Sequence, residues 1–462
     1  MKKSLLVKLI TIGALILLLL IPIAMIGNSI EERQRYSESV LQDIAKSSSH
    51  SQTLTGPVLV VPYSRIEYTT TFNELKEKIT ETREVNGKLY FLPELLRVDS
   101  EMDMKARSRG IYSAHLYHTK NKIDGKFSVP ADFGVGEKIA DYTFKPAYIA
   151  LGISDIRGIE NSLALQWDKS TFNAEPGSQV SLFHSGVHIK LDTVEAGKSY
   201  NFSLNLQLKG TNQFNLAPLG KETHLSMRSN WPHPSFIGDY LPIEHGITEH
   251  GFSARWQTSY FSTNMREQFY RCTQKQECAS FEQSKLGVNL IDPINHYVKS
   301  DRAIKYALLF IALTFAGFFL FEILKRLQVH PIQYALVGLA LAFFYLLLIA
   351  LSEHIGFALA YGISAAACVG LIGFYVSFVL QSVVRALGFT SALALLYALL
   401  YGLLSAEDYA LLMGSILLFA MLGVFMALTR NVDWYSLGNS GSNSNDSSAR
   451  KNSGDTAGAT WE

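Results

Sequence analysis

Apolar residues gather in two separate parts of the chain. The first is an uncharged run from Leu9 to Ile26, preceded by Lys2, Lys3 and Lys8. As a helix this run would be roughly 27 Å long, close to the thickness of a bilayer core. It is longer than the apolar region of a signal peptide, and the sequence AMIGNS at its end offers no small-x-small cleavage site. We therefore predict an uncleaved transmembrane anchor over residues 1–28 rather than a cleaved signal peptide.

The apolar signal returns near residue 304 and recurs in five segments, each long enough to cross a bilayer. The expected helices are Ile304–Leu324, Tyr334–Leu351, Phe357–Leu380, Ala386–Leu404 and Tyr409–Leu428. Because the connections between them are very short, neighbouring helices should run antiparallel. The pattern predicts a C-terminal bundle of five transmembrane helices over residues 304–430.

The long polar stretch between these two parts, residues 29–303, has the alternation of β-strands. Apolar and polar residues alternate from Tyr200 to Leu208, as in a strand with one buried and one wet face. GVHIKLD and EMDMKAR repeat the alternation, and clusters of Gly, Pro and Asn separate such runs. PVLVVPY predicts a short buried strand closed by Pro57 and Pro62. We expect a β-rich domain of antiparallel, sandwich-like sheets, entered through a helical continuation of the anchor over residues 30–45.

The distribution of cations predicts the orientation of the chain in the membrane. The lysines before the first helix place the N-terminus in the cytoplasm, and residues 29–303 then lie outside. With six crossings, the expected outer loops SEHIG and SAED carry no Lys or Arg. The cations near the later helix ends that fall inside are Lys325, Arg326, Arg385 and Arg430. The sequence therefore predicts a multi-pass protein of the cytoplasmic membrane with both termini in the cytoplasm.

Composition adds two limits to this picture. The chain is 48% hydrophobic and 18% charged, which fits one soluble part and one part in the lipid bilayer. Its formal net charge is +1, so no basic field argues for a nucleic-acid partner. Residues 431–462 are rich in Ser, Gly and Asn and nearly free of apolar residues, which predicts a disordered cytoplasmic tail.

Three cysteines divide between the two parts of the chain. Cys272 and Cys278 lie in the polar stretch, where an oxidising compartment would favour a local disulfide. Zinc is the competing interpretation, but the spacing is not that of a zinc knuckle and no nearby pair of histidines completes a site. Cys368 falls in an expected membrane helix and is interpreted as a small packing residue.

The 12 histidines are candidate metal ligands. His115 and His118 have the spacing of ligands on a helix, but the surrounding pattern is that of a strand, where residues three apart face opposite ways. His184 and His188 would share a face only if one strand continued through Gly186. We therefore predict neither a metal nor a cofactor.

One segment, SNWPHPSFIGDYLP (229–242), contains the residue types of a hydrolytic triad: His233, Ser235 and Asp239. Ser235 lacks the G-x-S-x-G elbow that would expose a nucleophile. Triads also draw their members from separate segments, whereas these three come from one short run. Pro232 and Pro234 remove two donors from a strand ladder, which places the segment at an edge or in a connection. We predict a rigid corner and no enzymatic activity.

Charged residues in the expected membrane helices lie only near the helix ends. They are Lys305, Glu322, Lys325, Arg326, Glu353, Arg385, Glu407 and Asp408. Transporters usually carry ionisable groups inside the bilayer, so this distribution weakens an ion-coupled transporter and leaves a lipid-handling protein open. Gly362, Ala366 and Gly370 recur at four-residue intervals, which is typical of a face that packs against another helix.

Several longer stretches are distinctive. They are LTGPVLVVPY (54–63), RGIYSAHLY (109–117), ISDIRGI (153–159), SNWPHPSFIGDYLP, GFSARWQTSYF (251–261), DRAIKYALLFIALTF (301–315), HPIQYALVGLALAFFYLLLIALSEHIGF (330–357) and TRNVDWYS (429–436). Together they resemble the CreD inner membrane protein family. The resemblance runs from the first helix to about Ser436, without the Cys272–Cys278 segment. It implies an inner membrane protein of Gram-negative bacteria with a large periplasmic domain. It also implies a link to cell-envelope integrity, envelope stress and colicin tolerance, under a two-component sensor–regulator pair. It supplies no catalytic residues, cofactor or ligand.

Three classes of function follow from these observations. The first, which we expect, is a non-enzymatic envelope protein whose periplasmic domain binds an envelope protein or lipid. The second is a membrane transporter or lipid-handling protein, which a lipid-sized groove between helices would support. The third is a periplasmic hydrolase, for which His233, Ser235 and Asp239 are the local candidates.

Overall fold

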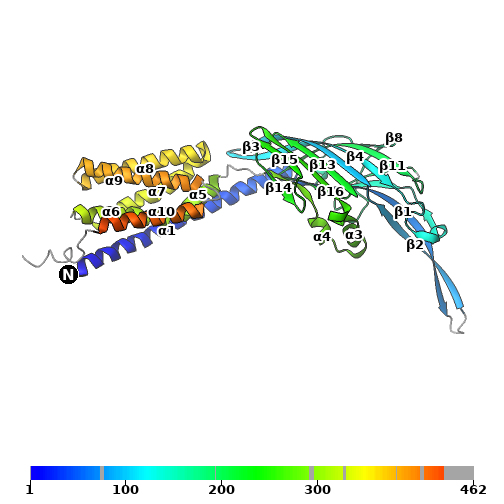
Figure 1. The fold of residues 1–462 in the computed structure, drawn as a ribbon, viewed down its shortest axis with the longest axis horizontal. Coiled ribbons are helices and arrows are strands. Elements are labelled where there is room, and N and C mark those ends of the chain that lie inside the picture. The colour runs from blue at the N-terminus through cyan, green and yellow to red at the C-terminus, as the bar shows by residue number, and fades with distance from the viewer. Residues whose placement is uncertain are drawn as a thin grey trace, which may run out of the picture. The chain divides into compact units, whose positions relative to one another are not determined.

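The computed structural model describes residues 2–72, 78–192, 194–290, 296–325, 329–380, 382–405 and 410–430 (Figure 1). The chain divides into two compact units. The first, here the helical unit, comprises Met1–Tyr36 and Ile294–Glu462, and the second, the β unit, comprises Ser37–Pro293. The expected tail, residues 431–462, lies outside the described residues.

A single helix, α1 (Lys2–Ser47), contains both the apolar run and the polar segment that follows it. The expected helical continuation over residues 30–45 is thus confirmed. Pro22 lies inside the helix, within the apolar part. The long apolar stretch near its N-terminus meets the length and hydropathy of a membrane span.

The C-terminal helices are α5 (His296–Lys305), α6 (Ala307–Lys325), α7 (Pro331–Ile355), α8 (Phe357–Val379), α9 (Val383–Ser405) and α10 (Ala410–Thr429). Among the described residues, four of them, α7 to α10, are long and apolar enough to cross a membrane by themselves. The expected count of five is therefore wrong for single helices. The expected helix Ile304–Leu324 is broken at Tyr306, and α5 and α6 pass the test only as one span bent by 46°.

Local sequence explains where α7 begins and ends. His330 is its N-cap: its ring nitrogen Nδ1 accepts the Ile332 N–H at 3.3 Å. Gln333 Oε1 accepts the His330 N–H in return at 3.1 Å, which completes a capping box. Gly356, at a φ of 79°, ends the helix and allows α8 to start at the next residue. The α7–α8 hairpin is therefore as tight as the sequence predicts.

In the described residues, the strands of the β unit form two sheets of nine and eight strands. The nine-stranded sheet consists of β1 (Gln52–Phe72), β2 (Lys78–Phe91), β5 (Tyr142–Phe144), β6 (Tyr148–Ile153), β9 (Glu175–Pro176), β10 (Gly186–Lys190), β12 (Gln213–Ala217), β14 (Pro234–Gly238) and β17 (Leu286–Leu290). The eight-stranded sheet consists of β3 (Leu95–Arg109), β4 (Tyr112–Ser128), β7 (Ala164–Trp167), β8 (Ser170–Asn173), β11 (Ser199–Thr211), β13 (Glu222–Ser229), β15 (Glu244–Thr248) and β16 (Gly251–Ser259).

The two sheets share one hydrophobic core, so the β unit is the expected sandwich. Leu59 of β1 and Val98 of β3 belong to the same buried cluster, and β11 alternates buried and exposed residues as predicted. The sheets are mixed, however, because β1 pairs with β12 in parallel and β3 pairs with β13 in parallel. Short-range alternation cannot reveal this, since parallel and antiparallel partners bury the same face.

The run PVLVVPY is part of a much longer strand than expected. Pro57 and Pro62 lie inside β1 rather than closing it. A change of register between Thr55 and Val58 accommodates Pro57, since a bulge leaves a backbone position unpaired. Pro62 has no N–H to place, and its carbonyl accepts the N–H of Lys145 at 2.8 Å.

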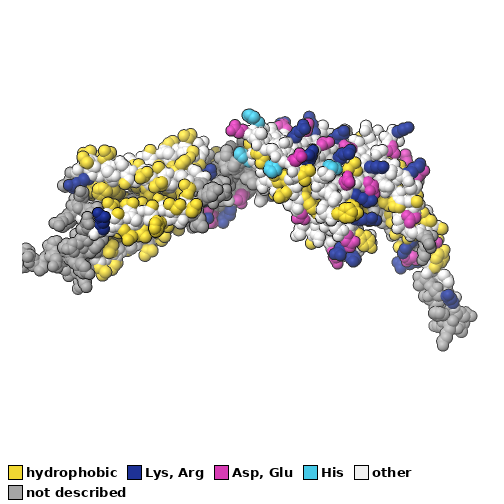
Figure 2. All heavy atoms as spheres, in the orientation of Figure 1, with side chains coloured by type: hydrophobic (Ala, Val, Ile, Leu, Met, Phe, Trp, Pro, Cys, Tyr) yellow, Lys and Arg dark blue, Asp and Glu magenta, His cyan; other side chains and the backbone are white. Residues whose placement is uncertain are grey.

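A short helical cover lies on the outer face of the nine-stranded sheet (Figure 1). It contains α2 (Tyr260–Thr263), α3 (Met265–Tyr270), η3 (Arg271–Lys275) and α4 (Ala279–Gln283). Its buried side chains pack on Val58, Val60 and neighbouring strand residues, in a second cluster distinct from the inner core. The surface of the β unit shows charges of both signs, whereas apolar side chains dominate the visible face of the helical unit (Figure 2).

Candidate functional site

Three neighbouring strands bring the first and last residues of the β sandwich to one end of the nine-stranded sheet. Gln52 of β1 lies opposite Phe214 of β12, whose neighbour Gln213 lies opposite Asn289 of β17. The chain comes from α1 immediately before this point and continues to α5 after it. We call this end of the β unit the junction. Two of the family-like stretches, residues 109–117 and 153–159, contribute to it.

Gln52 is the buried centre of the junction. Its Nε2 donates to Ser49 Oγ at 2.7 Å and to the carbonyls of Asp155 and Lys209 at 2.9 and 3.1 Å. Its Oε1 accepts the N–H of Asp155 and the hydroxyl of Ser154, both at 3.2 Å. The amide is therefore fully used in joining three separate segments, which fixes the first residues of β1 in place.

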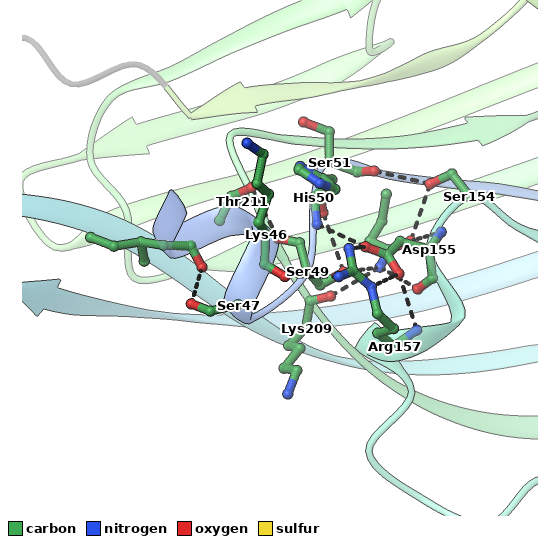
Figure 3. Close-up of polar contacts among 12 residues, drawn as sticks. Lys46, Ser47, Ser49, His50, Ser51, Ser154, Asp155, Arg157, Lys209 and Thr211 are labelled. Atoms are coloured by element: carbon green, nitrogen blue, oxygen red, sulfur yellow. Dashed lines mark hydrogen bonds and ion pairs between the residues drawn. The ribbon is translucent and has the colours of Figure 1, made fainter. Parts of the chain in front are cut away.

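Asp155 and Arg157 clamp the end of α1 to the β unit (Figure 3). Arg157 donates from Nη2 and Nε to the two carboxylate oxygens of Asp155 at 2.7 and 2.9 Å, while its Nη1 donates to the Lys46 carbonyl at 2.8 Å. Asp155 also accepts the N–H of His50 at 3.2 Å. The Arg157 side chain, with these backbone donors, holds the pKa of Asp155 far below its usual range. The charged pair thus satisfies a carbonyl that the last turn of α1 leaves unpaired.

Tyr117 completes the junction from the other sheet. Its hydroxyl donates to the Gln213 carbonyl at 2.6 Å and accepts the Gln52 N–H at 3.2 Å. Its ring leaves no space for a side chain at Gly210, where a Cβ would lie 2.3 Å from the hydroxyl oxygen. Full burial raises the pKa of Tyr117 far above its usual value, so it stays protonated. The residue therefore ties β4 to both β1 and β12.

Apolar contacts reinforce the polar clamp. Ile44, near the end of α1, forms a buried cluster with Ala114 and Leu116 of β4, and Val40 and Leu41 pack against it. The end of α1 therefore buries a face on the eight-stranded sheet while Arg157 holds the Lys46 carbonyl. This combination makes the α1 terminus part of the β unit.

The structure does not bring His233, Ser235 and Asp239 together as a triad. His233 is exposed, and its carbonyl accepts the Trp231 indole N–H at 3.0 Å. Ser235 lies in β14 opposite Asn289, and Asp239 accepts the Ser284 hydroxyl at 3.4 Å. Among the contacts of the described residues, none joins two members of the trio. β14 is the edge strand next to β17, as the prolines predict.

The structure gives His115, His118 and His188 partners other than a metal site. The His115 ring lies 4.6 Å from the Trp231 ring, and His118 Nδ1 lies 2.8 Å from Glu160 Oε2. His188 Nδ1 contacts the Gly177 carbonyl at 2.6 Å, and His184 lies before β10 rather than in it. No group of three or more metal-ligating side chains was found within the described ranges.

The cysteines of the β unit lie in the helical cover. The structure joins Cys272 and Cys278 by a disulfide, with their Cα atoms 4.4 Å apart. Cys272 is buried against the outer face of the nine-stranded sheet. Cys368 is buried in the helical unit, where it accepts the Tyr397 hydroxyl at 3.2 Å.

Two carboxylates hold α1 to other helices of the helical unit. Glu322 is only 5% exposed, forms an ion pair with Lys8, and accepts the Tyr334 hydroxyl at 2.9 Å and the Val329 N–H at 3.0 Å. Glu353 accepts the Tyr297 hydroxyl at 3.0 Å and lies 3.8 Å from Arg33. Sequence patterns mark these acids as helix-end residues, but their partners are distant in the chain and carry no local signal.

Comparison with known proteins places this architecture in a family. The model of the family "Inner membrane protein CreD" matches residues 4–435. The inner membrane protein CreD of Escherichia coli (strain K12) is 37% identical over 441 residues, which cover 94% of this chain and 95% of the relative. Among solved structures, an M1 zinc metallopeptidase mutant from Deinococcus radiodurans aligns at a TM-score of 0.21 and 7% identity, over 36% of this chain and 39% of that chain, too weakly to support any argument. The full-length sequence match is decisive, and the chain belongs to the CreD inner membrane protein family.

Proposed function

We propose that the protein is a non-enzymatic component of the inner membrane that supports cell-envelope integrity and the response to envelope stress. In this proposal, the β unit acts on the periplasmic side, where it meets an envelope protein or lipid. The helical unit anchors it in the bilayer.

The junction is the observation that supports this proposal most directly. A protein that only needs a membrane anchor can use a flexible linker, because tethering alone raises the local concentration of a domain. Here Arg157 holds the Lys46 carbonyl at the end of α1, while Asp155 and Gln52 hold the residues that follow it. The end of α1 is therefore built into the β unit and is not joined to it by a flexible linker.

The proposed orientation rests on the cations. Lys2, Lys3 and Lys8 precede the first apolar run, whereas the loop at His354 carries neither Lys nor Arg. With six crossings, both termini lie in the cytoplasm and the β unit lies in the periplasm. The bent α5–α6 pair supplies the sixth crossing in this arrangement.

Complementation of a Gram-negative strain that lacks its own family member tests the proposed function. The wild-type chain should restore resistance to detergent and reduce dye uptake, whereas Arg157→Ala should restore neither, at equal amounts of membrane-inserted protein. Lys190→Ala is the matched control, because Lys190 forms an exposed ion pair with Glu175 elsewhere on the β unit. Full complementation by Arg157→Ala, or no phenotype in the deletion strain, would contradict the proposal.

A groove in the helical unit keeps a lipid-handling role as the second candidate. It lies between α8 and α9, has a volume of about 390 Å³, and is lined by small side chains and by Tyr361, Tyr397 and Tyr401. Gly362 and Ala366, expected on a packing face, are exposed along it within this chain. The hydroxyl of Tyr361 donates to the Tyr397 carbonyl at 2.7 Å, which holds the two helices together beside the groove.

Filling the groove separates the two candidates. Ala366→Phe should displace any acyl chain from the groove, because the new ring would occupy its apolar space. Native mass spectrometry would then show loss of a co-purified lipid, and the envelope phenotype would change with it. Unchanged lipid content and full complementation by the variant would eliminate the lipid-handling role.

A further inference from the structure

One strand of the β unit has an unpaired edge inside a groove. Within the residues that the structure describes, β2 pairs only with β1. The Lys145 N–H donates to Pro62 from the side of β1 opposite to β2, so the Pro62 carbonyl points away from β2. Pro62 and its partner Lys88 are therefore a non-hydrogen-bonded pair of the antiparallel ladder, in which the backbone groups of the two residues point away from each other. The N–H and C=O of Lys88, and of Tyr90 two residues on, face away from the sheet.

The groove along this edge has two walls of different origin. Its volume is about 380 Å³, and residues 88–92 of the chain line it. On one side, the Tyr90 ring meets Phe269 of the helical cover edge-on at 5.5 Å. On the other side, the Phe91 ring lies 6.5 Å from Phe133. Consecutive residues of the strand thus face opposite walls, as they do in any sheet.

This geometry fits an added strand. An extended peptide that paired with Lys88 and Tyr90 would place alternate side chains against the helical cover and against Phe133. Against the first wall these side chains would meet Arg266 of α3, and against the second wall they would meet the apolar Phe133 ring. Main-chain bonds would provide part of the affinity, and the two walls would select the side chains.

Charge at the groove indicates the character of the occupant. Lys221 and Glu94 neutralise each other in an ion pair of 2.7 Å. Lys88 contacts the Gln179 carbonyl, and no ion pair or hydrogen bond holds the exposed Arg266 side chain among the described residues. The groove therefore keeps an excess of positive charge.

We propose that this groove binds an extended segment of a partner protein, in which apolar residues alternate with acidic ones, as an additional strand on β2. The inference deepens the proposed function, since that function places the β unit where an envelope partner can reach it. Its test uses the purified full chain and no cellular phenotype, so the two proposals can fail independently.

The experiment measures binding of a fluorescent peptide, Glu-Val-Asp-Phe-Glu-Val-Asp, to the full chain in nanodiscs by fluorescence anisotropy. Saturable binding is expected. Lys88→Pro should weaken it about tenfold relative to Lys88→Ala, because only proline removes the outward N–H and blocks the approach of a strand. Proline is tolerated at this position, since an edge N–H that faces away from β1 makes no ladder bond. Equal unfolding temperatures of Lys88→Pro and Lys88→Ala would verify that the fold tolerates proline at this position.

Two further comparisons decide between a strand and other occupants. The same peptide with every backbone nitrogen methylated should not bind, and Arg266→Glu should bind the parent peptide about tenfold more weakly than Lys190→Glu, an exposed cation outside the groove. The proposal is wrong if the parent peptide does not bind at millimolar concentration, or if Lys88→Pro matches Lys88→Ala. It is equally wrong if the methylated peptide binds, or if only soluble glycan fragments of the cell wall bind.

Discussion

At the scale of single residues, the clamp at the junction gives the stretch ISDIRGI a structural role. Asp155 and Arg157 are two positions apart, so their bidentate pair forms locally, yet each also reaches a distant backbone group at His50 or Lys46. The pair is therefore a connection between segments and not an isolated surface ion pair. Changes here should alter how the α1 terminus is held.

The pH dependence of unfolding should report the Asp155 carboxylate. Its pKa is lowered in the folded protein, so its stabilising contribution is present above the unfolded value near 4 and is lost as pH falls towards the folded value. The difference in unfolding temperature between wild type and Asp155→Asn should be larger at pH 7 than at pH 3. Glu244→Gln, at an exposed pair with Arg255, should show a much smaller difference at both pH values. A constant difference for Asp155→Asn would show that its charge does not stabilise the fold.

At the scale of elements, close contact with α1 depends on Gly338 of α7. A Cβ at this position would lie 2.2 Å from Leu19 Cδ1 and 2.8 Å from the Phe315 ring. Gly338→Leu should therefore destabilise the helical unit by about 1–3 kcal/mol through overpacking. Gly362→Leu is the control, since nothing lies within 4 Å of its added Cβ. Thermal unfolding in nanodiscs measures both, and equal transitions would contradict the role assigned to Gly338.

The Cys272–Cys278 disulfide closes a short loop within the helical cover. We expect one Cys272–Cys278 bond in protein prepared from cells, seen as a linked peptide by mass spectrometry after alkylation. Replacing both residues by Ala should lower the unfolding free energy of the β unit by about 2 kcal/mol, the value for so short a loop. Cys368→Ala should leave the linked peptide unchanged. Complete alkylation of Cys272 in native protein would refute the bond.

At the scale of the whole molecule, the number of crossings determines which loops face which side. Single cysteines at Glu249, His354 and Arg385, all exposed, can be labelled with a membrane-impermeant maleimide in cells with a permeabilised outer membrane. If the bent α5–α6 pair crosses, Glu249→Cys and His354→Cys should react in intact cells and Arg385→Cys only after lysis. If Arg385→Cys reacts in intact cells and His354→Cys reacts only after lysis, the α5–α6 pair does not cross the membrane.

Sequence patterns predicted the parts of this molecule that depend on local repetition. Neighbouring residues account for the alternation in β11, for the long helix α1 and for the tight α7–α8 turn at Gly356. Parallel pairing of β1 with β12 and the burial of Glu322 depend on partners far along the chain, which periodicity does not encode. The strand closed by prolines was wrong because a bulge allows Pro57 inside β1.

In the candidate functional site too, sequence patterns did not reveal contacts between residues that are distant in the chain. Residue type alone drew attention to His233, Ser235 and Asp239, which the fold leaves apart. No sequence pattern pointed to Gln52, because a buried amide that joins several segments has no sequence signature. The stretch ISDIRGI was visible only as a resemblance, and its contact with the α1 terminus becomes visible only in the structure.

The parallel pairing of β1 with β12 also affects how the β unit folds while the chain is being synthesised. Ribosomes make the chain from its N-terminus, so β1 emerges about 160 residues before the strand that pairs with it in parallel. At bacterial and eukaryotic synthesis rates of about 5–20 residues per second, this interval lasts roughly 8–30 seconds. During it, the start of β1 at Gln52–Thr55 lacks its partner strand, and an open strand edge is prone to aggregation. The start of nascent β1 should therefore depend on a holding chaperone until β12 is made.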